Sequence, residues 1–218
     1  NGVKVAKVGL ENFLITAPYV FAFVSELNKI TVTVDGAVTV YTRDKVGVTQ
    51  SDDTFVSRIR KNDSPDAINI FTIQNDTLML AAEIKQYDRE NHIVRYSDLL
   101  PRLFCDFPLL GTHDFAFPVV INSRAFDPTE PRNGIFLYGD NGEQNRNILK
   151  DACSLYAALI DYFIQKDYKD LHNIVCIPPI ESKDWINKDW YTSEVIEVLK
   201  TKIKEFPMFH MLDGSTKS

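Results

Sequence analysis

The sequence predicts an α+β fold, in which antiparallel strands come first and a helix-strand-helix stretch follows. The first half contains several runs in which apolar and polar residues alternate, and this is the pattern of a half-buried strand. The second half contains two segments whose apolar residues recur every three to four positions, as on an amphipathic helix. Because strands and helices are segregated along the chain, a doubly wound parallel sheet is not expected.

The same change of pattern divides the chain. We expect a strand-rich part that begins with a short helix at 1–100, a strand pair followed by helix-strand-helix at 101–206, and the start of a linker at 207–218. A chain of 218 residues suits one domain or two closely packed subdomains. It begins at Asn1 without an initiator methionine and ends on a polar turn, so we expect a fragment of a longer protein.

The first elements are a helix and a hairpin. Thr16 can cap a short helix whose first turn holds Pro18, where no amide hydrogen is needed. Residues 30–34 and 37–41 then alternate strictly on either side of Asp35-Gly36. An Asp-Gly pair between two alternating runs predicts a β-hairpin, with the threonines of both runs on its solvent side.

Further strands are expected along the rest of the first half and beyond it. The alternating or apolar runs that predict them lie at 55–60, 68–73, 78–84, 115–121 and 135–138. An extended segment is expected at 103–110, because Pro101 and Pro108 disfavour a regular helix there.

Two helices dominate the second half. Apolar residues keep a helical period over 143–166, and Asp140 with Glu143 can form a capping box at the start of this helix. A short apolar strand is expected at 173–177, where Pro178 ends it. The second amphipathic helix is expected at 193–206.

Composition argues against several classes of protein. The net charge is −6, and basic residues are interspersed with acidic ones, as in Arg43-Asp44-Lys45, so a nucleic-acid-binding protein is not expected. No apolar run reaches about 18 residues, so no membrane span is expected. The four histidines are scattered without metal-ligand spacing, and no metal site is expected.

The three cysteines are Cys105, Cys153 and Cys176. Each lies in an apolar segment, at wide spacing from the others and without an adjacent base. They are therefore interpreted as reduced thiols in the core of a cytoplasmic protein.

Two arginines attract attention in the stretch 113–137. Arg124 directly follows the expected strand 115–121, and Arg132 lies further along the same proline-punctuated loop. Loops held by a core strand commonly present functional groups to a ligand or a neighbouring domain. The alternative is that both arginines form surface ion pairs with Glu130 or Asp127, which would be weak and without function.

The sequence lacks the common catalytic and nucleotide-binding motifs. It contains no glycine-rich phosphate loop and no G-x-S-x-G elbow. Asp184 and Asp189, beside Trp185 and Trp190, could form a carbohydrate cleft with paired carboxylates. The favoured interpretation is a helix-capping surface turn whose tryptophans pack back on the core.

Four stretches of this chain resemble one protein family. They are RLFCDFPL at 102–109, DFAFPVVINSRAFDPTEPRNGIFL at 114–137, GLENFLITAPYVFAFVSELNKITV at 9–32 and EFPMFHMLDG at 205–214. Together they resemble the bacterial relatives of sacsin and of the ninety-kilodalton heat-shock chaperones, within the GHKL ATPase group.

The resemblance carries expectations about fold and function. In that family an ATP-binding domain comes first, and a transducer or middle domain follows with the left-handed β-α-β fold of a ribosomal protein domain. The family's ATP-binding motifs are absent from this chain. The resemblance therefore implies a transducer domain that couples the ATP state of an N-terminal ATPase domain to the rest of a chaperone-like protein.

The expected partners follow from the same resemblance. They are the protein's own N-terminal ATPase domain and client proteins. This fragment should bind no cofactor and should not hydrolyse ATP alone, whereas ATP and magnesium are expected for a full-length ATPase. The alternative function is a stand-alone protein-interaction domain without nucleotide dependence, which would use strand edges or the surface around Trp185 and Trp190.

The resemblance also assigns a role to the arginines. In the chaperone relatives, a middle-domain strand ending in Asn-x-Ser-Arg presents its arginine to the γ-phosphate held by the preceding domain. Residues 121–124, Ile-Asn-Ser-Arg, are similar, which makes Arg124 the matching position. The match stops there, because Ala125-Phe126-Asp127 departs from the Glu-x-Leu-Gln of the chaperones. Arg132 is the second candidate for the same contact.

Overall fold

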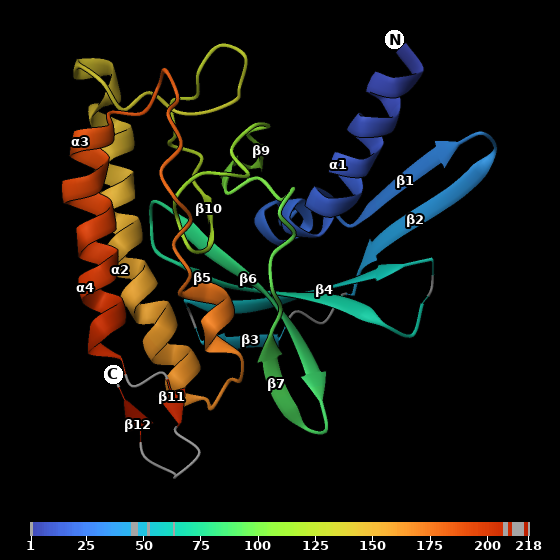
Figure 1. Cartoon of the computed structure of the whole chain (residues 1–218). Helices are drawn as coiled ribbons and strands as arrows, with labels where there is room; N and C mark the ends of the chain where they lie inside the picture. The colour runs from blue at the N-terminus through green and yellow to red at the C-terminus, as the bar shows by residue number, and fades with distance from the viewer. Residues whose placement is uncertain are drawn as a thin grey trace.

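The computed structural model describes residues 2–44, 48–51, 53–62, 64–206, 209–210 and 216–217. Strands and helices form separate layers (Figure 1), which confirms the α+β class. The helices are α1 (Gly2–Phe23), α2 (Glu143–Gln165), α3 (Lys188–Tyr191) and α4 (Glu197–Glu205), with 3-10 turns η1 (Asp140–Gly142) and η2 (Leu171–Ile174) and a π-helical turn η3 (Thr192–Ile196). No helix in these ranges is long and apolar enough to cross a membrane.

A ten-stranded sheet forms the centre of the described part of the chain. Its strands are β1 (Lys29–Val34), β2 (Ala37–Arg43), β3 (Val48–Ser51), β4 (Thr54–Lys61), β5 (Ala67–Gln74), β6 (Met79–Tyr87), β7 (Glu90–Ile93), β8 (Leu103–Cys105), β9 (Phe107–Pro108) and β10 (Val120–Asn122). The strand order is β1-β2-β4-β5-β6-β10-β8-β9, with β3 beside β4 and β7 beside β6. All neighbours are antiparallel except β10 and β8, which run parallel.

The predicted hairpin and the strands that follow it are confirmed. The β1–β2 turn places Asp35 and Gly36 at φ 48° and 80°, the positive values that a two-residue hairpin turn of the I′ type requires. Strands β4 and β5 cover the predicted runs 55–60 and 68–73, β6 begins one residue later than the predicted run 78–84, and the three pair in sequence order. The predicted extended segment 103–110 holds β8 and β9, which are joined by a sharp turn at Asp106 with φ 59°.

Helices cover both faces of the sheet. Successive side chains of a strand point to opposite faces of the sheet, so Phe71 and Thr72 on β5 lie on its two different faces. The ring of Phe71 packs against α2, with its centroid 4.8 Å from that of Phe163. Thr72 lines a cavity together with Phe23 of α1. The middle of β5 is therefore buried from both sides.

The first helix is longer than predicted. Thr16 does not cap it, because α1 runs from Gly2 to Phe23 and the Thr16 hydroxyl donates to the carbonyl of Asn12 within the helix at 3.0 Å. Pro18 lies inside the helix. Proline lacks the amide hydrogen of a regular helical bond and bends helices, and α1 changes direction before its end (Figure 1).

The two later helices are confirmed with changes at their starts. α2 spans 143–165 as expected, but no side chain caps it, so the capping box of Asp140 and Glu143 is wrong: Asp140 begins the 3-10 turn η1. The second helix begins at Lys188 rather than at 193, because the Asn187 side chain caps it by accepting from the Trp190 amide at 3.2 Å.

Two expected strands in the second half are largely irregular. Of 115–121, only the end forms a strand, β10; Pro118 lacks an amide hydrogen, and the Ala116 carbonyl accepts from the Tyr191 hydroxyl at 3.0 Å. Of 135–138, only Ile135 forms an isolated bridge, and the carbonyls of the next two residues accept from side chains of α2. These apolar runs reflect burial rather than strand pairing.

The expected strand 173–177 is also wrong. Its first residues belong to the 3-10 turn η2, Val175 follows in a turn, and the rest is irregular chain that belongs to no strand. The chain does return to the sheet after α2, because Lys169 forms an isolated parallel bridge with His92 of β7. Between the two helices the structure therefore has one isolated β-bridge and irregular chain in place of the expected strand.

The remaining expectations have mixed outcomes. All three cysteines are free, but only Cys153 is buried, whereas Cys105 is half-buried and Cys176 is exposed; the core interpretation was wrong for Cys176. Buried apolar residues before and after residue 100 belong to one core cluster, and where a subdomain boundary lies stays a prediction. Of the expected linker 207–218, the structure describes only β11 (Phe209–His210) and β12 (Thr216–Lys217).

The packing of α2 on the sheet yields a stability prediction. Phe71 is 0% exposed and its ring contacts those of Tyr162, Phe163 and Tyr168. Phe71→Ala should lower the free energy of unfolding by about 3–5 kcal/mol, since it leaves a cavity among these rings. Urea unfolding followed by circular dichroism measures this. Val38→Ala on the exposed β1–β2 hairpin should change it by less than about 0.5 kcal/mol, and equal effects would contradict the assigned core.

Candidate functional site

The chain just after β10 is held by two buried side chains. Asn122 accepts a hydrogen bond from the Asp106 amide through Oδ1 at 2.8 Å. The Ser123 hydroxyl donates to the carbonyl of Thr77 at 2.7 Å and accepts from the Ala125 amide at 3.2 Å. These bonds join β10 to the β8–β9 turn on one side and to the β5–β6 turn on the other. The backbone that carries the next residue, Arg124, is therefore fixed from both sides.

Arg124 itself is exposed and anchored at one nitrogen. Its Nε donates to both carboxylate oxygens of Asp106, at 2.9 and 3.0 Å, while 65% of the side chain remains exposed. The hydrogen bond to Asp106 raises the pKa of Arg124, which therefore stays charged. Its terminal nitrogens have no hydrogen-bond acceptor within the described ranges. Up to four N–H donors thus remain available to a ligand.

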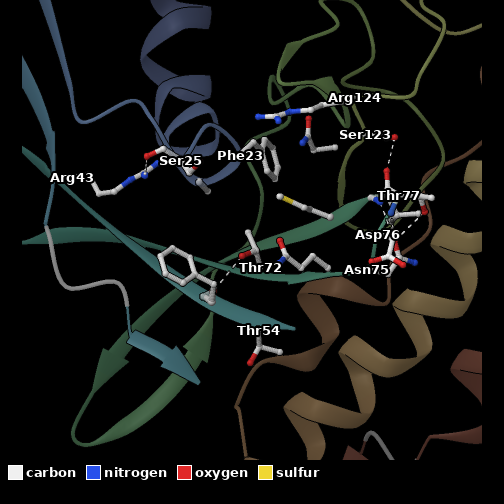
Figure 2. Close-up of a pocket in the computed structure, with 16 residues that line it drawn as sticks. Phe23, Ser25, Arg43, Thr54, Thr72, Asn75, Asp76, Thr77, Ser123 and Arg124 are labelled. Carbon is white, nitrogen blue, oxygen red and sulfur yellow. Dashed lines mark hydrogen bonds between the residues drawn. The ribbon is translucent and has the colours of Figure 1, made fainter. Parts of the chain in front are cut away.

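A cavity of about 570 Å³ lies beside this arginine, between the end of α1, strands β4 to β6 and the loop after β10. Figure 2 shows Arg124 reaching over it, with the guanidinium group directed toward the side of Phe23 and Ser25. Thr72 and Asn75 come from the sheet side. The cavity therefore has an apolar floor at Phe23 and polar groups at its rim.

A second arginine, Arg43, lines the opposite side of the cavity (Figure 2). Its two terminal nitrogens donate to the carbonyls of Ser25 and Val24, at 2.7 and 2.9 Å. These carbonyls follow the last turn of α1, where a cation is favourable. Burial lowers the pKa of Arg43. Each terminal nitrogen donates one bond to the end of the helix, and the buried Nε has no partner within the described ranges, so the main contacts of Arg43 are structural.

The β5–β6 turn completes the rim. The Asn75 side chain accepts from the amides of Thr77 and Leu78, at 3.0 and 2.9 Å, and this holds the turn in shape. Asp76 is exposed at the tip of this turn and lines the cavity. The position of Thr77 matters because its carbonyl is the acceptor for Ser123.

The charges around the cavity are mixed. Arg43 and Arg124 are opposed by Asp76 on the rim and by Glu26, whose charge interacts with both arginines. A site that captures free anions from solution concentrates one sign of charge. This cavity instead combines a charged arginine with a largely neutralised surrounding.

The structure separates the two arginines that the sequence singled out. Arg132 is exposed and does not belong to the lining of this cavity; its backbone has φ 51° and its amide donates to the Thr129 carbonyl at 2.7 Å. The alternative ion pair with Glu130 or Asp127 is wrong for Arg124, because its partner is Asp106.

The aspartate–tryptophan loop follows the favoured interpretation in part. Trp185 is buried, stacks on Phe115 with ring centroids 5.9 Å apart, and approaches Gly134 so closely that a Cβ there would lie 2.1 Å from the indole ring. Asp184 and Asp189 are both exposed. The helix cap is Asn187 rather than either aspartate.

Sequence reasoning missed the partners of Arg124. Asp106 is 18 positions away, and it meets Arg124 because β8 and β10 pair in parallel, with Phe104 opposite Asn122. No local pattern predicts that register. The signal that could have found Arg43 is its position at the end of an alternating run, directly after the helix and hairpin that it ties together.

The comparisons with known proteins do not place this chain in a family. No protein-family model, no curated protein and no solved structure matches it. Within the described ranges there is also no group of three or more histidine, cysteine, aspartate or glutamate residues that could hold a metal ion.

The anchoring of the loop after β10 yields a second prediction. Ser123→Ala removes the donor to the Thr77 carbonyl and the acceptor for the Ala125 amide in a buried place. The free energy of unfolding should fall by about 1–3 kcal/mol. Ser154→Ala on the exposed face of α2 should shift it by less than about 0.5 kcal/mol. Chemical unfolding of both variants measures the difference, and indistinguishable midpoints would show that Ser123 does not anchor the loop.

Proposed function

We propose that this chain is the middle, or transducer, domain of a chaperone-like GHKL ATP-binding protein. In this proposal it couples the ATP state of an N-terminal ATPase domain to the rest of the protein. The observation that carries the proposal is the geometry after β10. Asn122 and Ser123 are buried and bonded, whereas Arg124 projects with only Nε engaged.

That geometry suits an arginine that acts on a group held elsewhere. A guanidinium group anchored at Nε keeps its terminal edge free, and that edge can donate two parallel hydrogen bonds to phosphate oxygens. Because Asp106 and the backbone fix its position, little side-chain entropy is lost when a phosphate arrives. Charge that develops on a departing γ-phosphate is stabilised by such a preorganised cation.

The fold offers coarser support. β10 leads through η1 into α2, and the chain then returns to the sheet at the parallel bridge between Lys169 and His92. This connectivity, from a strand through a helix back to the same sheet, is that of a β-α-β unit. The second strand of the unit is represented here by the single bridge at Lys169. The left-handed crossover of the transducer fold is part of the proposal.

The division of roles among the residues follows. Arg124 is the proposed γ-phosphate contact, and Asp106, Asn122 and Ser123 are positioning residues. ATP and magnesium are assigned to the N-terminal domain, so no residue of this chain is proposed to hold them. Arg132, the other candidate from the sequence, is ranked second because it does not line the cavity that Arg124 borders.

ATP turnover by the full-length protein tests the assignment. Arg124→Ala should lower kcat by about 10²–10³-fold, the loss seen when a preorganised transition-state donor is removed. Arg124→Lys should recover only part of this, because lysine cannot keep an Nε anchor and a free edge together. Arg132→Ala tests the second-ranked candidate and should lower kcat by a much smaller factor, because Arg132 does not line the cavity. Both alanine variants should fold normally, since exposed ion pairs contribute little stability.

Two results would overturn the proposal. Wild-type kcat in Arg124→Ala would remove the phosphate role of this residue. Failure of the full-length protein to bind ATP at all would remove the coupling function, and the alternative of a nucleotide-independent interaction domain would replace it.

A further inference from the structure

A second cavity, of about 470 Å³, lies apart from the one beside Arg124. Four segments line it: the turn after β7, the residue before β8, Pro118 in the chain before β10, and the chain through and after η2. The side chains that matter for its chemistry are Arg95, Asp98, Arg102, His172 and Cys176. No residue that lines this cavity also lines the cavity beside Arg124.

Arg102 is the rigid part of its wall. Its amide donates to the Thr112 carbonyl at 3.0 Å, and its own carbonyl accepts from the Ile121 amide at 2.8 Å. Its guanidinium carbon lies 4.3 Å from the centre of the Tyr96 ring. That ring is fixed in turn, because its hydroxyl donates to the carbonyl of Ala81 at 2.8 Å. Both ends of the Arg102 residue are thus held before any ligand binds.

The guanidinium group of Arg102 lacks hydrogen-bond acceptors. Nε and Nη1 are buried, and neither has a hydrogen-bond partner within the described ranges. Nη2 is not among these buried atoms, and the Arg102 side chain lines the cavity. Burial lowers the pKa of Arg102, which reflects the cost of removing this cation from water. Because Nε and Nη1 are closed off from the cavity, Nη2 is the nitrogen of this guanidinium group that can donate to a ligand there.

The surrounding charges favour an anion. Arg95 and Arg102 contribute two cations, and the His172 ring lies on the same lining. Asp98 is the acidic side chain on the lining, and it pairs with Arg95 at 3.7 Å. Both members of that pair are largely exposed, at 79% and 89%, so the pair is weak and Arg95 is free to turn to a ligand.

We propose that this cavity binds a small oxyanion, a phosphate or a carboxylate group of a small molecule, with Arg102 as its anchoring cation. The oxyanion accepts from Nη2 at the cavity wall, and Arg95 and His172 supply further donors from the exposed side. Stacking on Tyr96 keeps the guanidinium plane in place, which favours a planar or tetrahedral oxyanion over a spherical halide. The site is independent of Arg124 and of the coupling proposal.

Direct titration of this 218-residue chain tests the site. Inorganic phosphate and acetate are added in separate arms, with chloride at matched ionic strength as reference, and calorimetry and the thermal midpoint are both recorded. We expect phosphate or acetate to bind and to raise the midpoint beyond the chloride reference. The arm with the tighter binding identifies which oxyanion the site takes.

Variants assign the binding to Arg102. Arg102→Met keeps the length and apolar stem of the side chain and should weaken oxyanion binding by at least about tenfold. Arg95→Gln and His172→Gln change exposed side chains, so they should fold even if Arg102→Met does not, and each should weaken binding by a smaller factor. Arg58→Gln on β4, outside this cavity, should leave binding unchanged.

The contrary results are equally definite. If phosphate and acetate act no differently from chloride on the wild-type chain, the stacking of Arg102 on Tyr96 is a structural contact only. If binding occurs but Arg95→Gln and His172→Gln bind as tightly as wild type, the oxyanion lies elsewhere.

Discussion

The pairing of β10 between β6 and β8 is the constraint on which the rest of the structure depends. Three residues, Val120–Asn122, form this strand, and they join the antiparallel meander of the first part to the helical second part. The strand is fully buried, and polar side chains fix the chain directly behind it. Because the register is set there, Asp106 faces Arg124 and the Thr77 carbonyl faces Ser123.

The described structure uses three arginines in three physical ways. The terminal nitrogens of Arg43 donate to carbonyls at the end of α1, so its role is structural. Arg124 is anchored through Nε and presents its remaining donors outward, which suits a charge delivered by a neighbouring domain. Arg102 is half-buried and stacked on Tyr96 with Nη2 open toward a cavity, which suits a small anion that enters there. The three arginines differ in which hydrogen-bond acceptors lie near their guanidinium groups. The residue type alone does not predict this difference.

Prediction from sequence succeeded where the evidence is local. The Asp35-Gly36 hairpin, strands β4 to β6 and helix α2 all follow from alternation, turn residues or helical period, each read within about a dozen residues. It failed at apolar runs without a clear period, such as 173–177, because burial alone does not distinguish a strand from irregular chain. For the candidate site, it found Arg124 but neither Asp106 nor Arg43.

The sequence by itself determined the α+β class, the order of its main elements, and the placement of an Asn-Ser-Arg turn at the end of a buried strand. The tertiary structure decided which carboxylate meets Arg124, which arginine shares its cavity, and that the Arg102 guanidinium stacks on Tyr96. These outcomes depend on the parallel register of β8 and β10 and on contacts between distant segments. Local propensity carries no information about either, since both arise only when the sheet assembles.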